Sequence, residues 1–237
     1  MTTWTHEVPM RWADIDMLRH VNNVAYLEYA AEAQARLAAE GAVRGDVASR
    51  VTISFLRPVL PSQEPLSVTT SFDAGVLTQE VWADSTGPAA RIVSSWDSAA
   101  PPEIPQDVVG PIDLHTRAAD TGKDGQVRLP KLFELVQESR VDLISRRMKG
   151  SSFGRFVVGT VEAQVYDTMP WRAEPYQVHG WVSRIGAGSF TVETVLSDAG
   201  RPLVSSSSVL VGFDLESQTS RPFTDDERAS LAVLQRD

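Results

Sequence analysis

The chain has 237 residues, with 42% hydrophobic and 22% charged residues and a formal net charge of −9. This composition is typical of a globular protein with a sizeable core, and the length fits one large domain or two small ones. The acidic balance argues against a nucleic-acid partner, because phosphate binding needs a surplus of Lys and Arg on at least one face. The absence of cysteine excludes disulfides, thiolate metal sites and a cysteine nucleophile.

The N-terminus has neither a basic segment nor an apolar stretch of the signal-peptide type. No run of about 18 apolar residues occurs in the sequence. We therefore expect a cytoplasmic protein with no membrane partner.

The first half is expected to form a short strand, a long helix and four further strands. Asn22 and Asn23 offer an N-cap for a helix from Val24 to Glu40, and Gly41 ends it. The β-rich runs that follow are separated by turn residues, which indicates antiparallel hairpins. These runs are Val51 to Leu56, Leu66 to Phe72, Val76 to Ala83 and Ala90 to Trp96.

A proline-rich segment follows near the middle of the chain. Four prolines lie between Pro101 and Pro111, and such a segment sustains neither a helix nor a central strand. The sequence therefore predicts a first domain at 1–98, a linker at 99–111 and a second domain at 112–237.

The second half is expected to repeat the order of elements of the first. Pro130 suits the first position of a long helix with a wide apolar face. The capping box Thr224 to Glu227 predicts a short C-terminal helix that packs on the outside through Leu231 and Leu234. The expected strands are Phe156 to Tyr166, Tyr176 to Ile185, Ser189 to Leu196 and Leu203 to Phe213.

The two halves also share a faint sequence repeat. An offset of 106 residues aligns Val21 with Val127, and an offset of 110 aligns Glu64-Pro65 with Glu174-Pro175. The shared order of elements favours a duplication over two unrelated α+β halves. Further identities at the first offset are Arg11 with Arg117, Ala13 with Ala119, Asp14 with Asp120, Glu28 with Glu134, Glu32 with Glu138, and Leu37 with Leu143.

The residues most suited to chemistry lie directly before the first helix. Asp14, Asp16, His20 and the only two asparagines of the chain, Asn22 and Asn23, fall within ten positions. A helix N-terminus exposes unpaired N–H groups and partial positive charge, so it can polarise a carbonyl oxygen. A nearby carboxylate adds a base or a nucleophile, and the two together are what acyl transfer requires.

The pattern Asp-x-Asp-x-x-x-His-Val-Asn-Asn-x-x-Tyr, from Asp14 to Tyr26, resembles two groups of hotdog-fold enzymes. These are acyl-CoA thioesterases of the 4-hydroxybenzoyl-CoA thioesterase type and acyl-ACP thioesterases. The resemblance implies an α+β fold of two tandem hotdog units, each a five-stranded antiparallel sheet wrapped around a long helix. It implies hydrolysis of an acyl-CoA with a fatty or aromatic acyl group, or of an acyl-ACP, without a cofactor or metal ion. Further pairing of such chains is common, so a homodimer is expected.

Carried over by position, the resemblance makes Asp16 the catalytic carboxylate, acting as nucleophile or as general base on water. It places the N–H that polarises the thioester carbonyl at Asn23. His20 is a third catalytic candidate, with orientation of the loop as the alternative. Asp14 is expected to be structural, because its counterpart Asp120 persists where the rest of the pattern is lost.

Three residues are candidates for substrate binding, each with a structural alternative. The structural alternative for Asn22 is to cap the helix, and the structural alternative for Tyr26 is to pack in the core. Arg57 precedes Pro58 as in many hotdog thioesterases and is suited to coenzyme A phosphates or to a salt bridge at a strand end.

The second half lacks the polar members of the pattern. Asp16 and His20 align with Gly122 and Gln126, and the asparagines align with Arg128 and Leu129, so we expect one active site per chain. Plant-type acyl-ACP enzymes commonly have an Asn where this chain has Leu18, which favours aspartate-based acyl-CoA chemistry.

Rival functions remain open. A hotdog hydratase or dehydratase is disfavoured because its motifs are absent, whereas a non-catalytic acyl-CoA-binding or regulatory protein would use the same fold. The stretch Gly150 to Gly154 fits a nucleophile motif but follows a helix instead of a strand, which indicates a loop. His6, His115 and His179 have no metal-ligand spacing.

Overall fold

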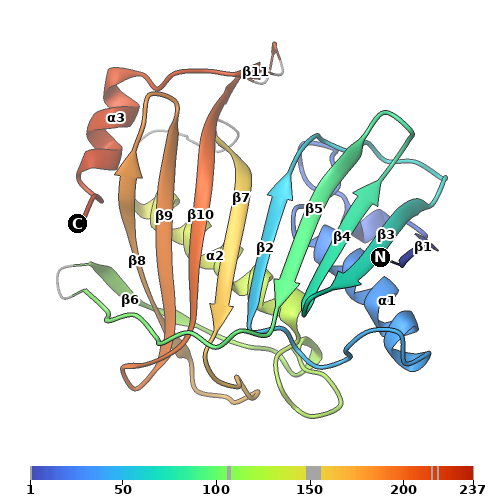
Figure 1. The fold of residues 1–237 in the computed structure, drawn as a ribbon. Coiled ribbons are helices and arrows are strands. Elements are labelled where there is room, and N and C mark those ends of the chain that lie inside the picture. The colour runs from blue at the N-terminus through green and yellow to red at the C-terminus, as the bar shows by residue number, and fades with distance from the viewer. Residues whose placement is uncertain (1, 106–107, 148–155, 215, 218, 237) are drawn as a thin grey trace. The chain divides into compact units, whose positions relative to one another are not determined.

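The computed structural model describes residues 2–105, 108–147, 156–214, 216–217 and 219–236, so the stretch Gly150 to Gly154 lies outside the described residues. The chain divides into two compact units, Met1–Ser98 and Ala99–Asp237. Each unit has its own antiparallel sheet and its own long helix, which lies against one face of that sheet (Figure 1).

The first unit contains five antiparallel strands in the order β1-β3-β4-β5-β2. Its helix α1 (Ala25–Ala39) packs against β1, β3, β4 and β5. The helix and the four strands after it are confirmed within a few residues of the expected bounds. The strands are β1 (Thr3–Val8), β2 (Arg50–Phe55), β3 (Leu66–Asp73), β4 (Val76–Trp82) and β5 (Pro88–Ser95).

Helix α1 owes its position to apolar side chains at helical spacing and to a defined C-terminus. Tyr26, Ala30, Ala33 and Leu37 recur every three or four residues and are buried. Gly41 adopts a left-handed φ of 72°. Its N–H donates to the Ala38 carbonyl at 3.0 Å, and the next N–H donates to the Leu37 carbonyl at 2.9 Å. This pair of bonds is a Schellman motif, and it confirms Gly41 as the end of the helix.

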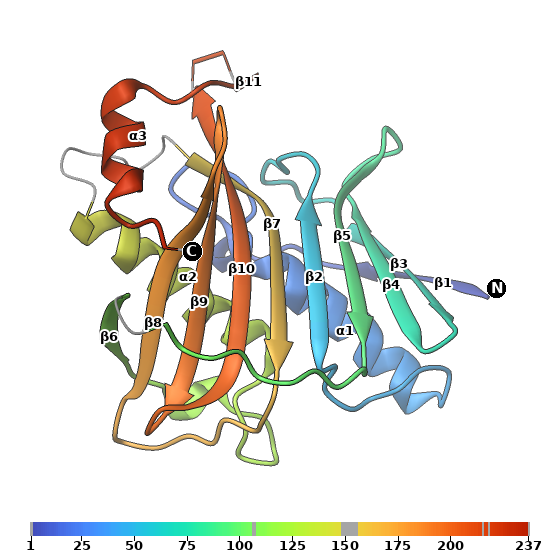
Figure 2. The ribbon, with the colours of Figure 1, turned by 60° about the vertical axis from the view of Figure 1, so that its left-hand side comes forward.

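The second unit has the sheet order β7-β10-β9-β8-β6, with the short strand β11 paired to β10. Helix α2 (Leu129–Arg147) packs against β6, β8 and β9, and helix α3 (Asp225–Ala232) packs against β8. Figure 2 shows α3 beside β8. The strands are β6 (Val109–Leu114), β7 (Phe156–Val165), β8 (Tyr176–Ile185), β9 (Ser189–Asp198), β10 (Arg201–Asp214) and β11 (Thr219–Ser220).

The end of the expected linker, residues 99–111, is already a strand. Strand β6 begins at Val109 and includes Pro111, which sequence analysis had placed outside the sheet. The strand lies at the edge of its sheet, and its pairing with β8 shifts register between Val109 and Ile112. An edge strand with an irregular register tolerates a proline, because the missing N–H removes no essential ladder bond.

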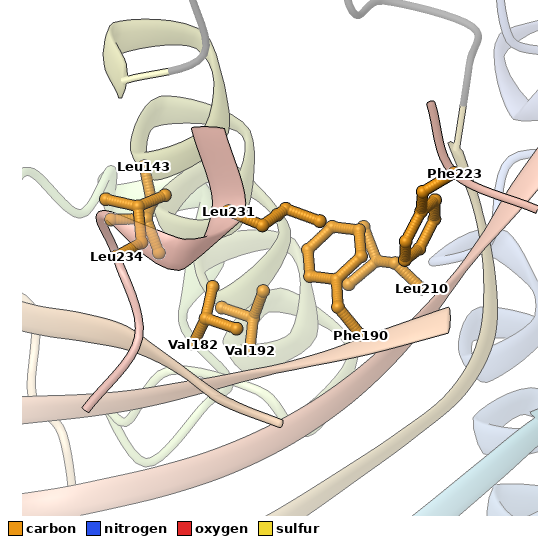
Figure 3. Close-up of a cluster of buried hydrophobic side chains, with 8 residues drawn as sticks. All are labelled: Leu143, Val182, Phe190, Val192, Leu210, Phe223, Leu231 and Leu234. Atoms are coloured by element: carbon orange, nitrogen blue, oxygen red, sulfur yellow. The ribbon is translucent and has the colours of Figure 1, made fainter. Parts of the chain in front are cut away.

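The capping box of α3 is confirmed, and this end of the chain packs through the two leucines that the sequence indicated. Thr224 Oγ1 accepts a hydrogen bond from the Glu227 N–H at 3.2 Å, and the Glu227 carboxylate accepts one from the Thr224 N–H at 2.9 Å. Leu231 and Leu234 are 0% and 2% exposed. They complete a core cluster with Leu143 of α2 and strand residues (Figure 3). The helix therefore closes the core of the second unit.

The loop before each long helix has the same hydrogen bonds in both units. The Asp16 N–H donates to the His20 carbonyl at 2.8 Å, and the Gly122 N–H donates to the Gln126 carbonyl at 2.8 Å. These two pairs differ by the offset of 106 residues found in the sequence. The backbone of the loop is thus common to both units, although the side chains differ.

The anchoring of this loop to a neighbouring strand end is also repeated. The Val21 N–H donates to the Val59 carbonyl at 2.9 Å, and the Val127 N–H donates to the Met169 carbonyl at 2.8 Å. The donors differ by 106 residues and the acceptors by 110, as the two sequence offsets predict. In the part of the chain that is described, none of the helices combines the length and the apolar character needed to cross a membrane.

Candidate active site

Asp14 stabilises the loop through its side chain and its backbone carbonyl. It ends the short 3-10 turn Trp12–Asp14, and its Oδ2 accepts hydrogen bonds from the Arg11 N–H and the Tyr29 hydroxyl, both at 2.7 Å. Its backbone carbonyl accepts the Asn22 N–H at 2.7 Å. Burial and the bond to Asp14 raise the pKa of the Tyr29 hydroxyl, so it remains a donor at neutral pH. The structural role expected of Asp14 is confirmed.

Asp16 has one fixed and one available carboxylate oxygen. Its Oδ1 accepts the N–H groups of Leu18 at 2.8 Å and of His20 at 3.1 Å. No described residue donates a hydrogen bond to Oδ2. The side chain is half-buried. The loop therefore orients the carboxylate through one oxygen and leaves the other free to attack or to accept a proton.

The start of α1 presents a backbone donor close to this carboxylate in sequence. Asn22 Oδ1 accepts the Val24 N–H at 3.2 Å, and the Asn22 carbonyl accepts the Ala25 N–H at 2.9 Å. Asn22 thus closes a local turn before the helix, but the N-cap residue of α1 is Val24, which has no side-chain cap bond. The Asn23 N–H makes no hydrogen bond with any described residue. This free donor at a helix N-terminus can bind a carbonyl oxygen or an oxyanion.

His20 enters the site mainly through its backbone. Its N–H donates to Asp16 Oδ1 and its carbonyl accepts the Asp16 N–H, so it helps to fix the carboxylate. No hydrogen bond joins its half-buried imidazole to a described residue. The ring is therefore not committed to a structural partner, and its catalytic part stays a hypothesis.

Tyr26 lies in the core of the first unit. It is 2% exposed, and its ring makes edge-to-face contacts with Phe55 at 5.8 Å and Tyr29 at 6.4 Å between centroids. Burial raises the pKa of the Tyr26 hydroxyl to about 12, an effect that the nearby Arg57 partly opposes. The hydroxyl is neutral at physiological pH. A contact of this side chain with substrate stays a prediction.

Arg57 forms the salt bridge that was the alternative to phosphate binding. Two of its nitrogens donate to the two carboxylate oxygens of Asp84, each at 2.9 Å, and its Nε donates to the Gly87 carbonyl at 3.0 Å. The guanidinium keeps the pKa of Asp84 well below its usual range. A substrate phosphate would have to compete with this bidentate pair.

Sequence reasoning missed two kinds of residue at this site. Tyr29 and Val59 anchor the loop through a side-chain and a backbone hydrogen bond, and neither belongs to the motif. Trp12 and Met17 flank the acidic residues and are 88% and 86% exposed, although both are large and apolar. The sequence could have indicated these two residues, because large apolar side chains are unusual at turn positions, where polar residues are common.

The comparison with family models concerns this part of the chain. Residues 2–82 match the model of the acyl-ACP thioesterase C-terminal domain, and the match contains the entire pattern from Asp14 to Tyr26. The resemblance to thioesterases is confirmed. Comparison with curated protein sequences gives no significant match.

Solved thioesterase structures share the fold over most of the chain. The 12:0-ACP thioesterase of Umbellularia californica is 12% identical, with 89% of this chain and 94% of that chain covered and a TM-score of 0.66. A Lactobacillus plantarum protein designated an oleoyl thioesterase is 11% identical, with 90% and 97% covered and a TM-score of 0.65. An acyl-ACP thioesterase of Bacteroides thetaiotaomicron is 13% identical, with 88% and 97% covered and a TM-score of 0.58. At these identities the likeness establishes the fold.

Proposed function

We propose that the chain hydrolyses acyl thioesters at one site, formed by Asp16 and the start of α1. The observation that carries this proposal is that one loop presents both an oriented carboxylate, with Oδ2 available, and an Asn23 N–H that has no partner among the described residues. The family match over residues 2–82 supports it, because that match contains both groups.

In the proposed reaction, the thioester carbonyl oxygen accepts a hydrogen bond from the Asn23 N–H, which stabilises the negative charge that develops on that oxygen. Asp16 Oδ2 then attacks the carbonyl carbon, or it removes a proton from a water molecule that attacks. In both routes the C–S bond breaks and the thiolate of the carrier leaves. After nucleophilic attack, a water molecule hydrolyses the mixed anhydride between the acyl group and Asp16, which releases the carboxylic acid and restores the carboxylate. In the general-base route, the attacking water itself supplies the second oxygen of the carboxylic acid product. The free imidazole of His20 is the proposed proton donor to the leaving thiolate.

We further propose that each unit is a hotdog domain, with domains at 1–98 and 112–237, and that only the first is catalytic. The matching loop of the second unit has Gly122 where the first has Asp16. Acyl-CoA is the proposed substrate and acyl-ACP the alternative carrier, with Asn22, Tyr26 and Arg57 as substrate-binding candidates. A homodimer and a cytoplasmic location complete the proposal.

A thiol-release assay tests this function. Wild type and Asp16→Asn are compared on acyl-CoA and acyl-ACP substrates of short to long chain and with an aromatic acyl group. Because general-base or nucleophilic groups typically contribute at least about a hundredfold, we expect turnover to fall by that factor or more. The control is Asp124→Asn, which changes an exposed carboxylate in the matching loop of the second unit and should retain full activity.

The assay also separates the non-catalytic alternative. If wild type binds acyl-CoA without releasing thiol, the chain is a binding or regulatory protein and the Asp16 loop is a ligand clamp. Turnover that persists in Asp16→Asn would remove Asp16 from the reaction.

A further inference from the structure

Helix α2 carries a buried arginine without a carboxylate partner. Arg140 is 4% exposed, and its single hydrogen bond to a described residue is the one that Nη1 donates to Ser208 Oγ at 3.0 Å. No carboxylate of the described residues forms an ion pair with it. Burial lowers the pKa of Arg140 to about 10, so the guanidinium is still positively charged at neutral pH. Four of its five N–H donors thus lack a described partner.

Three buried hydroxyls lie at the same place in the sheet. Ser206 and Ser208 alternate along β10 and therefore point to one face, and Thr194 of β9 is the cross-strand partner of Ser206. The three residues are 3%, 1% and 2% exposed. Ser206 Oγ and Thr194 Oγ1 have no hydrogen-bond partner among the described residues. We call Arg140, Thr194, Ser206 and Ser208 the Arg140 cluster.

In the first unit, a buried polar side chain at a comparable position in the sheet has hydrogen-bond partners within the protein. Gln79 lies on β4, between β3 and β5, as Thr194 lies on β9, between β8 and β10. Gln79 is 2% exposed, and its Nε2 donates to the Ala30 carbonyl of α1 at 2.8 Å and to Thr70 Oγ1 at 3.3 Å. The Arg140 cluster instead combines an unneutralised charge with two unpartnered hydroxyls. An arrangement of this kind is unfavourable unless another group supplies the charge and the acceptors.

We propose that the Arg140 cluster binds a monocarboxylate in the core of the second unit. A carboxylate accepts two parallel N–H bonds from a guanidinium, and its remaining lone pairs accept hydrogen bonds from hydroxyls. Its single negative charge balances the single positive charge of Arg140, whereas a phosphate dianion would leave an excess charge buried.

Apolar residues next to the cluster favour an organic acid over a bare inorganic ion. Leu143 lies one helical turn beyond Arg140, and Val192 is the cross-strand partner of Ser208. Both belong to the buried hydrophobic cluster shown in Figure 3. A carboxylate with a short aliphatic body therefore fits the chemistry of the cluster and of its surroundings.

Thermal unfolding of the full chain tests the proposal, with butyrate as the probe and chloride at equal ionic strength as the reference. A ligand that binds only the folded chain should raise the unfolding midpoint by about 5–10 °C at one hundred times its dissociation constant. Arg140→Met should lose this shift, and the control Arg184→Met, which removes an exposed arginine of β8, should keep it. No shift in wild type, an equal shift with chloride, or an equal shift in Arg140→Met would overturn the proposal.

A second variant is decisive if Arg140→Met does not fold. Ser206→Ala retains the guanidinium and removes one donor, and calorimetric titration should show butyrate binding about tenfold weaker than to wild type. An unchanged affinity in Ser206→Ala would contradict the carboxylate site. Because these readouts do not involve thioester hydrolysis, their failure would leave the proposed function untouched.

Discussion

The Tyr26 hydroxyl links a buried side chain to the behaviour of the protein in alkali. Its pKa is about 12 in the folded chain, against 10.0 for an ordinary tyrosine. A raised pKa contributes stability below pH 10, and this contribution disappears as the pH rises through 12. We expect wild type to lose about 2 kcal/mol more unfolding free energy than Tyr26→Phe between pH 9 and 12, measured by urea unfolding. If the unfolding free energies of the two proteins changed equally between pH 9 and 12, this assignment would be contradicted.

Arg19 lies at the tip of the loop that precedes α1 and has a left-handed φ of 60°. The matching residue of the second unit is Gly125, with a φ of 75°. Glycine adopts this conformation without the steric penalty of a Cβ atom, although it loses more entropy on folding. Arg19→Gly should therefore raise the unfolding free energy by about 0.5–1 kcal/mol in denaturant titrations. Arg19→Ala keeps the Cβ atom and should show no gain, so equal gains in both variants would point to the loss of charge.

Helix α1 is ended by a glycine whose backbone conformation contributes to its stability. Beyond Gly41 and its two chain neighbours, no atom of the described residues lies within 4 Å of a Cβ placed on Gly41, so a substitution there tests mainly the backbone. Gly41→Ala should lower the unfolding free energy by about 1 kcal/mol, because alanine disfavours the left-handed conformation of the Schellman motif. Gly41→Asn should lose less, since asparagine tolerates that conformation better. A larger loss in the asparagine variant would mean that the backbone is not the cause.

Elements with a local sequence signal were predicted well, and those that depend on distant residues were not. Gly41 and the Thr224–Glu227 capping box act through bonds within a few residues, so the C-terminus of α1 and the N-terminus of α3 were predicted. The proline signal was also local, but β6 forms because β8 offers a partner at the sheet edge. The helical pattern selected Leu231 as a packing residue, but it did not specify which side chains of other elements Leu231 contacts.

The same distinction holds for the candidate site. Asp16, Asn22 and the free Asn23 N–H lie within eight residues, and the motif was sufficient to select them. Tyr29 is part of the adjoining helix but outside the motif, and Val59 is remote in sequence. Their hydrogen bonds to the loop are therefore visible only in the three-dimensional structure. The salt bridge of Arg57 with Asp84 was an open alternative for the same reason.

The two units together should provide one catalytic site per chain. Gly122→Asp would restore a carboxylate to the second loop, but Gln126, Arg128 and Leu129 would still replace the other polar residues of the motif. We therefore expect no increase in turnover. A non-hydrolysable acyl-CoA thioether should titrate with a stoichiometry of one per chain in calorimetry, for wild type and for this variant. A stoichiometry of two would show that the second loop also binds substrate.

The exposed indole of Trp12 makes the loop before α1 observable without labelling. It is 88% exposed and lies two residues before Asp14, among six tryptophans in the chain. Indole emission shifts when water around the ring is replaced, so the difference between the spectra of wild type and Trp12→Phe isolates the signal of this loop. Rapid-mixing fluorescence on the two proteins would then follow the arrival of an acyl carrier in real time and separate that event from bond cleavage.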